Sequence, residues 1–529
     1  MDWIKTLLEQ QPLMAVFLTI AIGYLVGEIN IKGFSLGVGA VLFVALGIGW
    51  FAPKSAPAPM VGTLGLALFL YAVGVQYGKQ FIVGLTSAAG RRANLIALIG
   101  VLLAGVVSLA IAKAFGLELG YALGLFAGSG TSTPTLQAAI ATLGNDDPAV
   151  GYSVSYPFGV AGPILFLYFG FMFLKPKIDT AGGSRLEMLE VALRNQEHFG
   201  RTLGEVMSGL PPTVKIVAVR TAHHNMPAGP GHVLAENDVL LMTAPARNVL
   251  EQAGKGLGEP APGRVVKDRS DLDYLRVFAS KASIVGRTVG DLTLPGNKAV
   301  VVAEIRRGDT NILPRPDLLL EFGDRVGMLA HRDDFPALRK FFGDSIKGTA
   351  EFSYISIGLG MALGFLLGAI QFPIPGVGKL SVGLAGVLIM ALILGNMRRS
   401  GGMNWTIPLS ANLVLRNLGL TLFLAQVGMA SGPKFASTVA DSGVQMLLMG
   451  AVVLAALVLP ILVLGLAVFK MPYDEVAGIV AGACGNPAIL AYANKLTPTD
   501  RPDLGYAMIF PGMTIVKILF VDIVPALYR

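Results

Sequence analysis

Two short stretches of small and hydroxylated residues carry the strongest chemical signal in the sequence. The first reads AGSGTSTPTLQ from Ala127, and the second reads AGACGNPAIL from Ala481. In each stretch small residues permit a tight turn, and an N-cap type of residue, Thr133 or Asn486, then precedes a proline at the expected first helical position. Each stretch therefore predicts a helix that starts in the middle of an apolar segment. The unpaired amides and the positive dipole end of such a helix can bind a carboxylate.

Glycine and proline in these stretches could also serve only to kink helices and to pack them closely. That reading does not explain the hydroxyl groups gathered in the first stretch, so we favour a binding role. The substrate-binding residues expected here are Ser129, Thr131, Ser132, Thr133, Pro134, Cys484, Gly485, Asn486 and Pro487.

Two cations lie inside apolar segments. Arg416 stands about halfway along the segment 404–429, where a charge is costly and usually functional. Its guanidinium can pair bidentately with a carboxylate; the alternatives are a structural ion pair or an arginine that reaches the interface. Lys517, in the last segment, is expected either to bind substrate or to satisfy carbonyls of the two stretches. Further side chains could line the same cavity or only join helices: Gln76, Gln426, Asn412, Asn417, Tyr152 and Tyr506.

The elements that must hold these residues are membrane helices. The chain is 53% hydrophobic and 14% charged, with a mean hydropathy of +0.64, and more than half of its charged residues lie between Lys175 and Lys347. Six apolar segments precede this polar insert, and six follow it. They are expected at about 12–28, 34–51, 60–78, 93–115, 120–142, 149–174, 353–372, 379–396, 404–429, 442–469, 474–493 and 505–526.

The two sets of segments are copies of each other. Leu64–Phe81 aligns without a gap with Leu418–Phe435, and the shared glycines stay in register. The same separation places Gly62 opposite Arg416, so the duplication is broken at the cation. We expect an asymmetric substrate to be held where the copies differ.

Orientation depends on the fifth segment of each half. If these segments span the membrane, the two halves are parallel. If they are re-entrant, the two halves are inverted, and modestly more of the loop Lys and Arg residues lie on the side of the insert than on the opposite side. We therefore expect an all-α polytopic membrane protein of two inverted repeats, each with five transmembrane helices and one re-entrant hairpin, and a central soluble α+β insert of two similar small domains. The expected boundaries are 1–174, 175–262, 263–350 and 351–529, with the insert cytoplasmic and both termini outside.

The insert changes to short β-type runs between Gly, Pro and charged turns. Strands are expected at Val214–Val219, Val239–Met242, Ala299–Ile305 and Arg325–Leu329. The segments Gly286-Arg287-Thr288 and Gly323-Asp324 resemble the C-terminal domain of regulators of potassium conductance. An earlier unit, with Gly200-Arg201-Thr202 and with Asn237 in place of the glycine, resembles it more weakly. The resemblance implies a module that binds a small regulatory ligand or dimerises; an interface domain that binds nothing is the equal alternative.

Several function classes find no support. The basic excess is spread thinly over loops, so no nucleic-acid partner is expected. All five histidines lie in the insert, Cys484 is the only cysteine, and no GxxxxGK(S/T) motif or metal-spaced His/Cys cluster occurs. We expect no enzyme activity, no cofactor and no metal.

The whole chain resembles the aspartate:alanine exchanger family of bacterial transporters. The resemblance rests on the LGLxLFLxxVGxxxG segments at Leu64 and Leu418, on the two small-residue stretches and on the conductance-regulator-like units. It implies a homodimer in the lipid of the bacterial inner membrane that exchanges a small anionic substrate, an amino acid or a dicarboxylate, by an elevator motion. The alternatives are an organic-acid exporter, a ligand-gated channel and a membrane sensor. Apart from Asp522, no acidic group lies well inside a span, which favours exchange over sodium symport.

Overall fold

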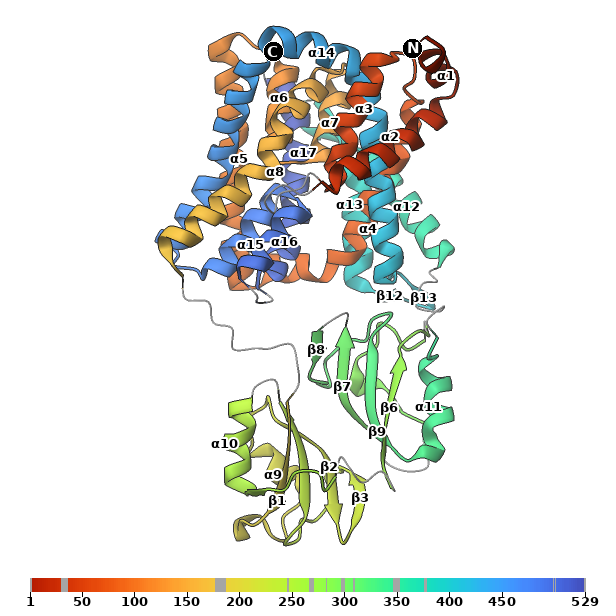
Figure 1. Cartoon of the computed structure of the whole chain (residues 1–529), viewed down its shortest axis with the longest axis vertical. Coiled ribbons are helices and arrows are strands. Elements are labelled where there is room, and N and C mark those ends of the chain that lie inside the picture. The colour runs from red at the N-terminus through yellow and green to blue at the C-terminus, as the bar shows by residue number, and fades with distance from the viewer. Residues whose placement is uncertain are drawn as a thin grey trace. The chain divides into compact units, whose positions relative to one another are not determined.

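A computed structural model describes residues 2–29, 37–176, 187–244, 247–265, 271–281, 283–295, 300–307, 310–345, 353–374, 378–497, 499 and 501–527. The chain forms two compact units (Figure 1). A helical unit comprises Met1–Asp179, Ser353–Thr406 and Asn412–Arg529, and the second unit comprises Thr180–Phe352 with Ile407–Ala411.

The first half of the helical unit follows the predicted apolar segments. After the short helix α1 (Asp2–Gln10), its helices are α2 (Pro12–Gly27), α3 (Ala40–Phe51), α4 (Pro59–Thr86), α5 (Ala88–Phe115), α6 (Leu119–Ser129), α7 (Thr133–Leu143) and α8 (Asp147–Leu174), and the 3-10 turn η1 (Gly37–Gly39) precedes α3. The fifth predicted segment is thus two short helices, α6 and α7, with a break between them.

The second half repeats this order. Its helices are α12 (Tyr354–Ala369), α13 (Ala385–Met397), α14 (Leu409–Val463), α15 (Tyr473–Cys484), α16 (Pro487–Leu496) and α17 (Arg501–Leu527). The third and fourth predicted segments are one continuous helix, α14, because no helix-breaking turn separates them. Two small hairpins, β10 (Gln371–Ile374) with β11 (Gly378–Ser381) and β12 (Arg399–Ser400) with β13 (Met403–Asn404), flank α13. The expectation of a purely helical membrane part was therefore wrong at these two connections, where short strands pair.

Six stretches of the described helices are long and apolar enough to cross a bilayer: α4, α5, α8, the two parts of α14 (Leu409–Thr438 and Gly443–Val468) and α17. A seventh arises if α1 and α2, which meet at a bend of 109°, count as one span. α2, α3, α12 and α13 have 16, 12, 16 and 13 residues, fewer than the roughly 20 needed to span. The unit is a multi-pass helical bundle, and ten spans remain a prediction.

Glycines of the duplicated segments let the two halves pack on each other. A Cβ atom added to Gly65 of α4 would lie 2.5 Å from the carbonyl oxygen of Gly419 in α14. Gly65 and Gly419 are equivalent positions of the repeat, so the two copies cross at the same residue. Gly74 packs on Ala391 of α13, and its counterpart Gly428 packs on Ala45 of α3. The duplication therefore extends from the sequence to the helix contacts.

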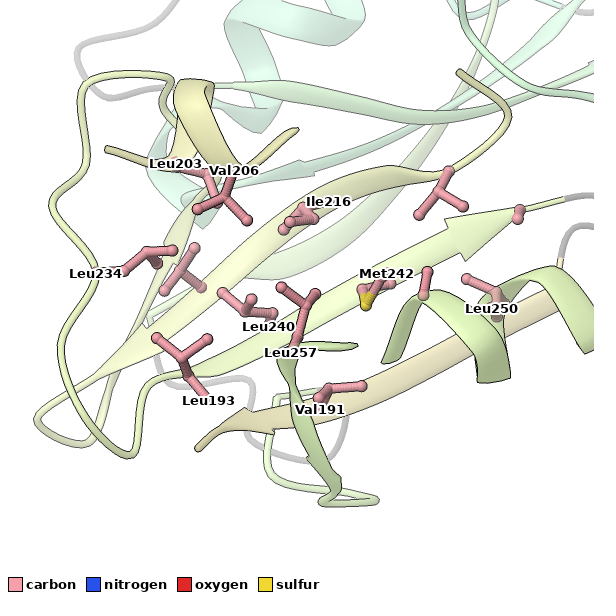
Figure 2. Close-up of a cluster of buried hydrophobic side chains, with 14 residues drawn as sticks. Val191, Leu193, Leu203, Val206, Ile216, Leu234, Leu240, Met242, Leu250 and Leu257 are labelled. Atoms are coloured by element: carbon pink, nitrogen blue, oxygen red, sulfur yellow. The ribbon is translucent and has the colours of Figure 1, made fainter. Parts of the chain in front are cut away.

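The first part of the insert is a five-stranded antiparallel sheet of order β3-β2-β4-β1-β5. The strands are β1 (Glu187–Leu193), β2 (Lys215–Thr221), β3 (His224–Pro227), β4 (Val239–Ala244) and β5 (Gly258–Pro260), with helices α9 (Leu203–Ser208) and α10 (Arg247–Leu257). Apolar side chains of the sheet and of both helices form one core, drawn in Figure 2 around Leu240, Ile216 and Leu250. The alternation of apolar residues along β2 and β4 supplies this face.

The second part repeats the pattern in the order β6-β9-β7-β8. Its strands are β6 (Asp273–Phe278), β7 (Val301–Arg307), β8 (Thr310–Ile312) and β9 (Arg325–Ala330), and α11 (Phe335–Phe342) matches α10. The register shifts at Ile216/Ala218 in the first sheet and at Val302/Glu304 in the second. The four predicted strands correspond to β2, β4, β7 and β9, and apart from β5, which has no counterpart among the described strands of the second part, the two sheets have the same topology.

The turn motif that the two parts of the insert share has the same kind of backbone conformation and the same hydrogen bond in both parts. Gly323 has φ +85°, and Asn237, which replaces glycine in the first part, has φ +67°, a conformation that asparagine tolerates better than most residues. The following carboxylates, Asp324 and Asp238, each accept the backbone N–H three residues earlier at 2.8 Å. These aspartates are buried in their own turns and serve the structure.

Replacing Gly65 with alanine should destabilise the helical unit, because the new methyl group meets backbone atoms of Gly419 that cannot rotate away. We expect a loss of about 1–3 kcal/mol in the free energy of unfolding. Thermal unfolding of the purified protein in detergent measures the change. Gly358→Ala in α12, where nothing lies within 4 Å of the added Cβ, is the matched control. Equal melting temperatures for the two variants would contradict this packing.

Candidate functional site

The break between α6 and α7 exposes the start of a helix. α6 ends at Ser129, and α7 begins at Thr133, one residue earlier than predicted, so that Ser132 and not Thr133 stands at the N-cap. The Ser132 side chain caps no amide and instead lies 2.6 Å from the hydroxyl of Thr135. The first turn of α7 therefore keeps its positive end without a side-chain acceptor.

Thr131, inside this break, has an unusual backbone. Its φ of +42° lies in the left-handed region that β-branched residues rarely adopt. Its hydroxyl donates to the Cys484 carbonyl oxygen at 3.0 Å, which ties the first break to the second. Such strain persists where surrounding contacts hold it and is concentrated at functional sites.

The break between α15 and α16 has the same plan with different chemistry. Gly485, with φ +81°, ends α15, and Asn486 caps α16 by accepting the Ala488 N–H at 2.9 Å. Asn486 thus occupies the predicted cap position, and Pro487 begins the helix. Because Pro487 has no N–H and the Ala488 amide is already bonded, α16 offers a dipole but fewer free amides than α7 does.

Lys517 of α17 joins the two breaks. Its ammonium donates to the Gly130 carbonyl oxygen at 3.1 Å and to the Ala483 carbonyl oxygen at 2.6 Å, and the residue is only 2% exposed. Of the two predicted roles, the structure places Lys517 in the second, on the carbonyls. The ammonium lies at the negative, carboxyl-terminal ends of α6 and α15. The positive, amino-terminal ends of α7 and α16 are therefore not engaged by Lys517.

The two helix starts face one cavity of about 370 Å³. It brings together ten of the predicted residues: Thr131, Ser132, Thr133, Pro134, Arg416, Asn417, Gly485, Asn486, Pro487 and Tyr506. The other residues that line it are Gly37, Val38, Gly39, Phe69, Tyr156, Leu420, Ala488 and Phe510. These residues are distant in sequence and come from both halves of the helical unit.

Arg416 is the one charged side chain among the residues lining the cavity. Its Nη1 lies 3.3 Å from the Gln76 side-chain oxygen and 3.4 Å from the Tyr77 hydroxyl. Both partners are neutral, and the salt bridges found within the described ranges include none to Arg416. The structural ion pair considered above is thus not seen there, and the guanidinium charge is available to an anion.

The remaining predicted residues lie outside the lining. Gln76 reaches the site only through Arg416, and Ser129 donates to the Gly450 carbonyl oxygen at 2.9 Å. Gln426 is buried against Gly62 at the crossing of α4 and α14, and Cys484 contributes its carbonyl group while its thiol is buried. Their substrate-binding roles stay predictions without support from the cavity geometry.

Tyr156, Phe510 and the turn Gly37–Gly39 line the cavity without having been singled out from the sequence. Tyr156 and Phe510 are counterparts in the repeat, with the same separation as Leu64 and Leu418. That alignment, extended four residues beyond Tyr152 and Tyr506, would have revealed them. Gly37–Gly39 gave no signal because they lie at the edge of an apolar segment far from both breaks.

Comparisons with known proteins bear on this arrangement. Residues 15–172 and 356–526 match the family described as Predicted Permease Membrane Region, and residues 274–343 match the TrkA-C domain. An uncharacterized transporter of Geobacter sulfurreducens is 38% identical, with 98% of each chain covered. Uncharacterized transporters of Symbiobacterium thermophilum (35% identical, 98% of this chain and 99% of the relative) and Corynebacterium diphtheriae (33% identical, 97% and 98%) are similar over their full lengths.

If one ammonium holds both breaks, Lys517→Met should loosen them together. We expect hydrogen exchange at the Thr131, Ser132 and Gly485 amides, which bond to the ends of α6 and α15, to accelerate about tenfold, because each lost hydrogen bond contributes about 1 kcal/mol or more. Hydrogen–deuterium exchange with peptide mass spectrometry measures this. Lys113→Met, at an exposed site in α5, is the control. Acceleration at one break only would show that Lys517 does not couple them.

Proposed function

Because the chain belongs to the aspartate:alanine exchanger family of permeases, we propose that it is a secondary transporter that exchanges small carboxylates across the bacterial inner membrane. Family membership makes the chain a multi-pass membrane transporter. The cargo, the exchange and the route are inferred from the residues of the site.

The observation that carries the proposal is the charge balance of the cavity. Arg416 and the positive ends of α7 and α16 face it, and its described lining contains no Asp or Glu. A small carboxylate would neutralise the guanidinium and accept hydrogen bonds from the free amides of α7. A cation would find no counter-charge there.

The charge balance of the cavity also indicates which candidate substrates fit it best. Aspartate and alanine bring an ammonium group, for which the cavity offers only neutral acceptors such as the Asn417 side chain. A dicarboxylate without an amino group, such as succinate, brings no ammonium. The cavity therefore suits dicarboxylates best, with amino acids such as aspartate next, and an organic-acid exporter would use the same contacts in one direction.

Inverted repeats with re-entrant hairpins account for the positions of the breaks. Within the helical unit of Figure 1, α6 and α7 lie toward the end where α1 lies, and α15 and α16 lie toward the opposite end. Hairpins that enter from opposite sides and meet at a shared cavity are the arrangement expected for inverted repeats. On this topology the insert is cytoplasmic and both termini are outside.

An elevator motion fits the way in which the helices are joined. Lys517 and the Thr131–Cys484 hydrogen bond link both hairpins, so they would move as one body. α4 and α13 pack closely through Gly74 and Gly78 and would form the stationary part, shared in a homodimer surrounded by lipid.

The insert offers a place for a regulatory ligand. A cavity of about 280 Å³ lies between the two sheets, with Leu241 on one wall and Tyr274, Arg276 and Glu304 on the other. The Lys215 ammonium donates to the Val302 carbonyl oxygen at 3.2 Å across this interface, and burial lowers the pKa of Lys215. A small molecule bound there would change how the two domains pack.

Exchange predicts that transport needs substrate on both sides. Proteoliposomes preloaded with unlabelled dicarboxylate or aspartate should take up the labelled compound at least about tenfold faster than empty ones, because the loaded site must cross in both directions. Radiolabel uptake over minutes measures the rate. Equal uptake into empty vesicles would refute exchange and favour an exporter running in reverse. A current without any counter-substrate would favour a channel.

A further inference from the structure

The two halves differ at a second position of the cavity. Tyr156 of α8 and Phe510 of α17 are counterparts in the repeat, and both line the cavity. The two side chains share a ring and differ by one hydroxyl group. A substrate therefore meets a hydrogen-bonding group from one half and an apolar edge from the other.

The two rings lie in different surroundings. The Phe510 ring centroid is 6.3 Å from that of Tyr77, whose hydroxyl contacts Arg416. Each ring lies against the tyrosine four residues earlier, Tyr156 at 5.3 Å from Tyr152 and Phe510 at 5.1 Å from Tyr506, but Tyr156 also lies 6.1 Å from Phe43 of α3. Phe510 thus belongs to the side of the cavity where the guanidinium is held, and Tyr156 belongs to the side formed by α3 and α8.

The start of α3 fixes the Tyr156 hydroxyl in place. A Cβ atom added to Gly39 would lie 2.7 Å from Cζ of Tyr156, so only glycine leaves room for the phenol. The Tyr156 ring is 7% exposed. A group held this closely gives up little conformational entropy when it bonds a ligand.

Tyr156 and Asn486 line the cavity together. The Asn486 side-chain oxygen already accepts the Ala488 N–H, which assigns the amide nitrogen to the other side. The Tyr156 hydroxyl carries one proton, and because Tyr156 lines the cavity it can donate this proton to an acceptor bound there.

We propose that Tyr156 is a specificity-determining residue, which donates its hydroxyl proton to an oxygen of a second carboxylate while the first carboxylate binds Arg416. This inference rests on the proposed carboxylate transport and names the class of its substrate: short dicarboxylates. A monocarboxylate of the same length would use Arg416 alone.

Binding of succinate and of butyrate to the purified full-length protein tests the proposal. Isothermal titration calorimetry of the wild type should give tighter binding of succinate. In Tyr156→Phe the affinity for succinate should fall about tenfold, the cost of one hydrogen bond to a charged acceptor, while that for butyrate stays unchanged. Phe510→Tyr, which adds the hydroxyl on the opposite side, should not restore succinate binding to Tyr156→Phe.

Tyr168→Phe removes a phenol hydroxyl from an exposed position of the same helix and should keep the wild-type ratio of affinities. An unchanged ratio in Tyr156→Phe, or an equal loss for both acids, would overturn the role of Tyr156 while leaving carboxylate transport intact. Wild-type protein that neither binds nor exchanges any carboxylate would overturn both. Matching melting temperatures and a single size-exclusion peak show that each variant is folded.

Discussion

The ammonium of Lys517, held between the Gly130 and Ala483 carbonyl oxygens, is the contact on which the arrangement of the site depends. Two helices end at this point, and the partial negative charges of their carbonyl ends would repel each other without a cation between them. With the cation in place both breaks come together, and the helices that start beyond them point their positive ends at one cavity. The buried charge thus acts at a distance from the substrate, since Lys517 does not line the cavity.

The internal duplication accounts for the helical scaffold, and the positions at which the two halves differ account for the polar groups of the cavity. The equivalent glycines Gly65 and Gly419 pack on each other, and the equivalent Gly74 and Gly428 pack on α13 and α3, so the two halves contribute nearly equal scaffolds. The cavity differs from that symmetry wherever polar groups matter. In the alignment of the two halves, Arg416 is equivalent to Gly62 and Tyr156 is equivalent to Phe510. Asn486 caps its helix, whereas Ser132 does not. A cavity built from two equivalent halves would present the same groups twice, whereas this one can distinguish the two ends of a substrate.

Most helices, both helix starts and the internal repeat could be predicted from the sequence, because the patterns that indicate them are local. Apolar length placed the helices, the proline after Thr133 and Asn486 placed the helix starts to within a residue, and the shared glycines gave the repeat. Contacts between distant residues could not be read in this way. That Lys517 bonds carbonyls and does not line the cavity, that Gln426 packs at Gly62, and that Gly37–Gly39 reach the site all depend on how helices cross. The β-hairpins beside α13 were missed because strands of two to four residues give no distinct pattern. The continuous α14 was missed because the polar stretch around Pro433 and Lys434, between its two apolar parts, has the composition of a loop.

The central claim is that Arg416, opposite two helix starts, holds a carboxylate. Titration of a dicarboxylate into the wild type and into Arg416→Gln and Arg416→Lys at low ionic strength tests it most directly. We predict that Arg416→Gln loses binding by about a hundredfold or more, because a charge-assisted, bidentate contact in a confined cavity disappears. Arg416→Lys should retain part of the affinity through its charge. Wild-type affinity in Arg416→Gln would contradict the account and place the substrate elsewhere in the helical unit.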